Sequence, residues 1–198
     1  MLLKHFFTGK IAHSSYILAG KQSCAVIDPR RDVELYIREA RELGVTITHI
    51  LETHLHADFI SGHMDLARQT GATIYAPKSA RCAFDHVAVA EGDTIGIEDM
   101  SLEVWETPGH TPEHVSYVVT DRSRGESPVG VFVGDVLFVG DVGRPDLFPG
   151  IATELAGKLY HSLHDKLLTL PDFCEVYPAH GAGSLCGRSM GAKWLTTI

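Results

Sequence analysis

A strand that runs directly into a group of metal-binding side chains constrains this chain more than any other feature. The apolar run 47–51 is closely followed by His54, His56 and Asp58. Side chains at positions i, i+2 and i+4 point to one side of the chain while the backbone stays extended. This spacing indicates metal ligands or acid–base residues. Histidines of a polar loop that cap the next helix or face water would leave the same pattern.

Three later motifs also place His or Asp at a predicted strand end. His110 stands in a Pro/Gly turn after a strand, Asp135 follows the apolar run 129–133, and His180 follows the short strand 175–177. A buried carboxylate such as that of Asp135 is costly unless it is neutralised. Each motif is unremarkable alone, but four of them in this order predict one polar cluster.

Hydrophobic periodicity predicts a layered α/β (α+β) domain whose later strands are mostly antiparallel. Asp32 and Ser61 are the predicted N-caps of the first two helices, and Gly44 and Gly71 end them. The predicted helices are 33–43, 61–70 and 153–168. The predicted strands are 15–18, 24–27, 47–51, 73–76, 94–97, 102–106, 115–120, 129–133, 136–139 and 175–177.

Composition excludes several classes of protein. The 198 residues carry 17 basic and 25 acidic side chains, a net charge of −8, and the scattered basic residues argue against a nucleic-acid partner. The longest apolar stretch, 129–142, includes Asp135 and Asp141 and is shorter than the roughly 18–20 residues of a membrane span. Lys4 and His5 interrupt any signal-peptide core. Four widely spaced cysteines favour a reducing, cytoplasmic location.

The four motifs together resemble the metallo-β-lactamase fold, an αββα sandwich with a metal site at one edge between its two sheets. They are HxHxD at 54–58, GH at 109–110, GD at 134–135 and AHG at 179–181. The resemblance covers nearly the whole chain and implies a single domain, 1–198. It also implies that one pocket is lined by His54, His56, Asp58, His110, Asp135 and His180.

One position departs from the usual HxHxDH motif of that family, because Phe59 stands where the last His is expected. In dinuclear members this His helps to hold the second metal ion. A phenyl ring removes that nitrogen donor and leaves Asp58 and His180 with only a bridging carboxylate. The substitution therefore weakens the case for a two-metal hydrolytic mechanism.

The remaining residues resemble the mononuclear centre of the persulfide dioxygenases, a branch of the same fold. The resemblance implies one Fe²⁺ per chain held by His54, His110 and Asp135, with Zn²⁺ as the alternative ion. Two imidazoles and one carboxylate with other positions open suit a non-haem iron that binds substrate and O₂ together. The other catalytic candidates, which would orient ligands or water, are His56, Asp58 and His180.

Three further stretches resemble the bacterial persulfide dioxygenases that are often fused to rhodanese domains: 52–62, 140–147 and 180–187. Within the second stretch, Arg144 is the candidate to bind a substrate carboxylate, a task suited to its planar set of donors. The alternative for Arg144 is an ion pair with Asp141 or Asp146.

The resemblance implies a dioxygenase that oxidises a low-molecular-weight thiol persulfide, such as glutathione persulfide, with O₂ to sulfite and thiol. The enzyme alternative is a metal-dependent thioester hydrolase of the hydroxyacylglutathione hydrolase (glyoxalase II) type. A non-enzymatic alternative is a degenerate site that only binds sulfur compounds or a partner. The resemblance also implies a homo-oligomer and a rhodanese domain or partner. Because relatives continue well beyond the position of His180, we expect a truncated or excised catalytic domain.

Other polar residues have weaker signals. His114 either approaches the pocket, or lies at the surface or behind the ligands. Asp28 either supports the site or forms a turn. Cys186 is expected to be a buried, inert thiol rather than a contact for a sulfur substrate. The helical His161 and His164 are expected to be exposed. The histidines without a ligand context, assigned to structure or solvent, are His5, His13, His49, His63 and His86.

Overall fold

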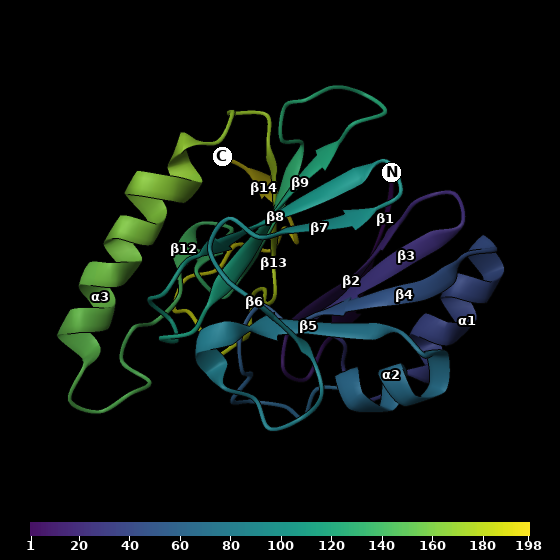
Figure 1. The fold of residues 1–198 in the computed structure, drawn as a ribbon. Helices are drawn as coiled ribbons and strands as arrows, with labels where there is room; N and C mark the ends of the chain where they lie inside the picture. Colours follow the sequence, from purple (N-terminus) through teal and green to yellow (C-terminus); the bar gives the residue numbers. More distant parts are fainter.

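Two six-stranded sheets form the centre of the computed structural model, which describes residues 1–198 (Figure 1). The first sheet contains, in spatial order, β1 (Leu2–Thr8), β2 (His13–Ala19), β3 (Ser23–Ile27), β4 (Thr46–Leu51), β5 (Thr73–Pro77) and β6 (Val87–Val89). The second contains β14 (Thr196–Thr197), β13 (Glu175–Pro178), β10 (Gly130–Gly134), β9 (Val115–Asp121), β8 (Met100–Glu106) and β7 (Thr94–Ile97). A separate hairpin joins β11 (Leu137–Phe138) and β12 (Asp141–Val142).

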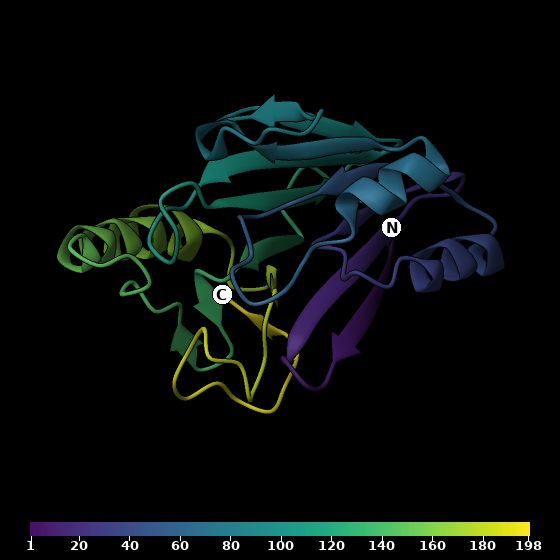
Figure 2. The same ribbon diagram turned by 90° about the horizontal axis from the view of Figure 1, so that it is seen from below.

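Helices cover the outer side of each sheet. The helices α1 (Glu34–Leu43) and α2 (His63–Thr70) lie against the first sheet, and α3 (Ala152–His161) lies on the far side of the second (Figures 1 and 2). The predicted αββα sandwich is therefore confirmed. The strands β3 to β6 are parallel, as the alternation with helices requires, whereas β7 to β10 are antiparallel. No helix is long and apolar enough to cross a membrane.

Three apolar clusters correspond to the three interfaces between these layers. The central cluster joins the facing sheets and includes the fully buried Ile27, Leu102 and Phe132. A second packs α1 and α2 on the first sheet around Tyr36, and a third packs α3 on the second sheet around Leu159. Burial of apolar surface contributes roughly 25 cal/mol per Å², so these clusters hold the layers together and fix the edge where the sheets meet.

Both predicted N-caps are wrong, although both helix ends are confirmed. The first helix is preceded by Val33 and the second by Gly62, neither with a side-chain cap. The side chain of Asp32 instead pairs with Arg30, and the hydroxyl of Ser61 donates to the buried carboxylate of Glu52 at 2.7 Å. Both side chains are therefore engaged by other residues and do not cap a helix. The predicted C-terminal residues Gly44 and Gly71 adopt left-handed conformations, at φ of 70° and 75°.

Most predicted strands are confirmed to within two residues, but four strands were not predicted and one helix changes. The strands β1, β6, β12 and β14 were not expected; three of them have three residues or fewer, and β14 pairs only with β13. The predicted helix 153–168 is α-helical only to His161. It continues as a π-helical turn, Ser162–Lys166, and a 3₁₀ turn, Leu167–Thr169.

The topology brings the predicted polar residues to one edge of the sandwich. His54 follows β4 of the first sheet, while Asp135 follows β10 and His180 follows β13 of the second. His110 lies in the loop between β8 and β9. A backbone bridge between His13 and His180 joins the two sheets at this edge.

Glu98 connects the sheets at another point of the sandwich. It lies in the turn between β7 and β8, and its carboxylate accepts the backbone N–H groups of Lys21, Gln22 and Ser23 from the turn between β2 and β3. These three hydrogen bonds lower the pKa of Glu98 from 4.5 to about 2. The charged carboxylate is therefore the form that joins the two turns.

We predict that Glu98→Gln lowers the melting temperature at pH 7 by a few degrees. A group whose pKa falls on folding stabilises the protein above its unfolded pKa, and that stabilisation disappears as pH drops. The difference between variant and wild type should therefore shrink from about pH 4.5 and vanish near pH 2. Thermal unfolding across this range measures it, with the exposed Glu103→Gln as control. A pH-independent difference would contradict the role of charge.

Candidate metal centre

Three buried side chains from different segments converge at the edge described above. The Nε2 atoms of His54 and His110 lie 3.6 and 3.4 Å from the Oδ2 atom of Asp135. One nitrogen from each imidazole and one carboxylate oxygen lie within 4.8 Å of one another. All three residues are at most 2% exposed. This is the set that the resemblance assigned to the metal.

The hydrogen bonds around His54 decide which of its nitrogens faces the centre. The carboxylate of Asp28 only accepts, so the hydroxyl of Thr53 donates to it at 2.9 Å. The Thr53 oxygen, in turn, accepts from Nδ1–H of His54 at 2.9 Å. The proton of the neutral imidazole is thereby held on Nδ1, and the lone pair of Nε2 faces Asp135.

A different hydrogen bond holds the proton of His110 on Nδ1 as well. Its Nδ1–H donates to the backbone carbonyl oxygen of Arg144 at 3.0 Å, which leaves the Nε2 lone pair free. Metal-binding imidazoles usually donate the N–H of their second ring nitrogen to a carbonyl or another oxygen in this manner. Two oriented lone pairs and one carboxylate thus fit a divalent transition-metal ion.

Asp135 carries the negative charge of the centre. Burial by itself would raise the pKa of this carboxyl group, but the neighbouring imidazole of His180 outweighs it and holds the pKa well below its usual range. His114 fixes the backbone at this point, because its Nε2 accepts the N–H of Asp135 at 3.0 Å and its Nδ1–H donates to Thr107. Burial lowers the pKa of His114 to about 3, so it remains neutral. Of its predicted placements, the one behind the candidate ligands is what the structure shows.

His180 lies between two carboxylates. Its Nδ1 is 2.7 Å from Asp135 and its Nε2 is 2.9 Å from Asp58. Burial opposes the charge on His180, but both carboxylates raise its pKa far above the ordinary value. Cys186 completes a second group of possible ligands with Asp58 and His180, although burial raises the pKa of its thiol. The proton-bearing His180 is a bridge between the two acids.

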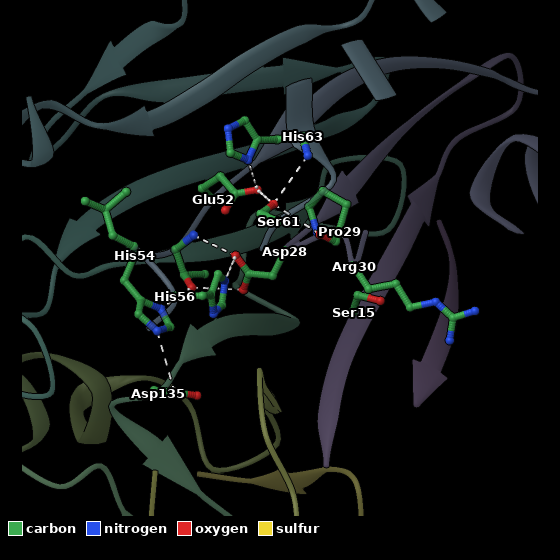
Figure 3. A network of polar contacts seen from close by, with 12 residues as sticks. Ser15, Asp28, Pro29, Arg30, Glu52, His54, His56, Ser61, His63 and Asp135 are labelled. Carbon is green, nitrogen blue, oxygen red and sulfur yellow. Dashed lines mark hydrogen bonds and ion pairs between the residues drawn. The ribbon is translucent and has the colours of Figure 1, made fainter. Parts of the chain in front are cut away.

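His56 has other partners in the polar network of Figure 3, which also includes His54 and Asp135. Its Nε2 lies 3.3 Å from Asp28, and it forms a third group of possible ligands with Asp28 and Glu52. The imidazole is therefore outside the group of His54, His110 and Asp135. Burial opposes protonation of His56, but the two carboxylates outweigh it and raise its pKa. The imidazoles of His54 and His56 thus contact different carboxylates, although their ring centroids are only 4.2 Å apart.

Asp28 stands at the centre of this network (Figure 3). It accepts the N–H and the hydroxyl of Thr53 and faces His56. Its backbone is left-handed, with φ of 48°, which is unusual for a residue other than glycine. Of the two predicted roles, support of the site is the one the structure shows.

Arg144 shows the predicted alternative in its side chain. Its guanidinium forms a paired contact with Asp146, at 2.7 and 3.1 Å, and is partly exposed. Its backbone supports the centre through His110, and its N–H donates to the carbonyl of Cys186. Arg144 therefore lies beside the pocket, with its charge already partnered.

The remaining histidines follow the prediction with one exception. His161 and His164 are exposed, as expected. His13 was assigned to structure or solvent, but it lies within the site: its ring centroid is 5.3 Å from that of His180 and 4.2 Å from that of Phe59. No local pattern in the sequence marked it, because it precedes the predicted strand 15–18. The others partner local groups away from the three predicted ligands: His5, His49, His63 and His86.

This fold and this site define a class. The chain belongs to the metallo-beta-lactamase superfamily, whose family model matches residues 8–180. Within it, the chain is homologous to persulfide dioxygenases: it is 34% identical over 187 residues to mouse (Mus musculus) mitochondrial persulfide dioxygenase ETHE1, covering 91% of this chain and 68% of that enzyme. It is also 38% identical over 160 residues to the hydroxyacylglutathione hydrolase of Rhodospirillum rubrum, covering 80% of this chain and 57% of the hydrolase.

Solved structures give the same result. A metallo-beta-lactamase from Staphylococcus aureus superposes with a TM-score of 0.91 at 39% identity, over all of this chain and 60% of that chain. ETHE1 from Myxococcus xanthus superposes with a TM-score of 0.84 at 30% identity, over all of this chain and 80% of that chain. The chain thus spans about two thirds of the mouse enzyme and less of the staphylococcal chain.

We predict that Gly143→Ala disrupts the metal centre. An added Cβ would lie 1.8 Å from the carbonyl oxygen of Asp135 and 3.1 Å from the Cβ of His110, so two ligands must move. Displaced or unsupported ligands typically cost 10–100-fold in metal affinity, and we expect at least a tenfold loss. Competition with a chromophoric chelator measures it.

The matched control is Gly157→Ala on α3. A Cβ there meets no atom within 4 Å, so metal affinity should be unchanged while helix propensity raises stability by about 0.5–1 kcal/mol. Equal metal affinity in the Gly143 variant and the control would refute the role of this close approach.

Proposed function

We propose that the protein is an iron-dependent dioxygenase that oxidises a low-molecular-weight thiol persulfide, such as glutathione persulfide, to sulfite. Persulfide, O₂ and water would give thiol, sulfite and two protons. The observation that carries the proposal is the three-membered ligand group of His54, His110 and Asp135, which His56 does not join. Similarity to the persulfide dioxygenases supports it.

Fe²⁺ would supply the redox chemistry and the open positions for substrate and O₂. The protein's own residues hold that ion: Thr53 and the carbonyl of Arg144 orient the two imidazoles, and His114 fixes the backbone of Asp135. Oriented donors lower the cost of assembling the centre. One Fe²⁺ per chain is thus part of the proposal.

Asp58 and His180 have a role in handling protons. His180 holds a proton between the carboxylates of Asp58 and Asp135, and the side chain of Asp58 is 30% exposed. This pair therefore links the buried Asp135 to a partly exposed carboxylate at the surface. Its place in the reaction would be to donate the His180 proton to the thiolate that leaves when sulfite forms.

Arg144 would bind a carboxylate of the thiol carrier. It lies beside Cys186, and Asp146 holds its guanidinium in a fixed orientation. A substrate carboxylate would share the guanidinium with Asp146 or displace it. Displacement costs little, because solvent screens an exposed ion pair.

A thioester hydrolase is the second candidate, because the chain is similar to a hydroxyacylglutathione hydrolase. That chemistry in two-metal form needs donors for a second ion. Phe59 offers none, and the rings of His13 and His56 pack against it instead, with centroids 4.2 and 4.5 Å away. The second ion would depend on Asp58, His180 and the high-pKa thiol of Cys186. We therefore favour the dioxygenase.

Metal analysis after anaerobic purification, followed by O₂ uptake with glutathione persulfide, tests the proposal. We predict one iron per chain, one O₂ consumed per sulfite formed, and a loss of at least a hundredfold in activity and of bound iron in His110→Ala. The exposed His161→Ala serves as control, since its ring partners only the helix neighbours Asp165 and Tyr160. Two zinc ions per chain, thioesterase activity and no O₂ uptake would establish the hydrolase instead.

A further inference from the structure

His13 is the one imidazole of the centre without a polar partner. Its side chain is fully buried, and neither ring nitrogen forms a hydrogen bond or an ion pair. Each neighbouring histidine commits at least one ring nitrogen to the protein. A buried polar group without a partner typically costs about 1–3 kcal/mol, so its retention needs a reason.

The backbone holds this unpartnered ring in place. The N–H of Ser14 donates to the carbonyl of Ala179 at 2.7 Å, and the N–H of Gly181 donates to that of Ala12 at 2.9 Å. These bonds flank the bridge between His13 and His180. Ala12 is buried, and its backbone is left-handed, with φ of 52°. This conformation is energetically unfavourable for a residue with a Cβ. Such strain clusters at functional sites.

The surroundings of His13 place its ring beside the residues of the candidate centre. Its ring centroid lies 5.3 Å from His180, 5.6 Å from His56 and 4.2 Å from Phe59. Burial chiefly, and then the neighbouring imidazoles and Arg30, keep its pKa well below the ordinary value. A neutral imidazole has one N–H donor and one acceptor, and here both are free.

We infer that His13 donates a hydrogen bond to the anionic sulfur of the bound persulfide, or of the thiol product, and so positions the substrate at the centre. The inference rests on the proposed function for the class of substrate. Phe59 packs against the ring and contributes no competing polar group. The backbone hydrogen bonds on either side of His13 therefore fix the position of its imidazole. His13 is absent from all three groups of possible metal ligands, which separates it from metal binding.

The test is His13→Phe, which keeps the ring and removes both nitrogens. Without substrate the variant loses an unpartnered polar group, so the metal-free protein should melt higher, by about 2–4 °C for each kcal/mol gained. The Zn²⁺-loaded variant should bind glutathione at least tenfold more weakly, measured by calorimetry. In the iron-loaded enzyme, kcat/KM should fall at least tenfold with unchanged metal content, and His13→Asn, which retains an N–H donor, should recover part of it.

The control is His49→Phe on β4, where a half-buried imidazole bonds to Thr48 away from the pocket, and no change in glutathione binding is expected. A His13→Phe protein that melts below wild type, loses its metal, or binds glutathione as tightly as wild type contradicts the inference. So does a wild-type protein that binds no glutathione. If wild type binds glutathione but consumes no O₂ with persulfide, the proposed function fails, while the binding comparison still decides the role of His13.

Discussion

The buried carboxylate of Asp135 is the group around which the rest of the site is arranged. A fully buried charge is tolerated only where partners surround it, and here His180 supplies a hydrogen bond, His114 anchors the backbone, and two further imidazoles face the same oxygen. These partners come from both sheets and from the loops at one edge. The apolar interface between the sheets therefore determines a charge arrangement as well as a fold.

Two short chains of hydrogen bonds orient the two candidate imidazole ligands at this edge. Asp28 orients Thr53, and Thr53 orients His54, while the carbonyl of Arg144 orients His110. The same Asp28 faces His56, so one buried acid both supports a ligand and engages the ring next to it. The number of imidazoles free to bind a metal ion thus depends on supporting residues such as Asp28.

The sequence predicted the sandwich and the convergence of His54, His110 and Asp135 because both leave local marks. These marks are apolar periodicity, and His or Asp closely after a strand. It predicted less well where a side chain has two possible partners. Ser61 looks like a helix cap, but Glu52 takes its hydroxyl, and Arg144 pairs with Asp146. His13 was missed because its importance depends on the bridge from β2 to His180, and pairing between segments so far apart has no local signal.

Crystals of the iron-loaded protein, measured on both sides of the iron absorption edge, would test the central claim most directly. The account predicts one anomalous peak per chain, bonded to Nε2 of His54, Nε2 of His110 and a carboxylate oxygen of Asp135, with His56 still on Asp28. Two peaks, or one peak held by Asp58, His180 and Cys186, would contradict it.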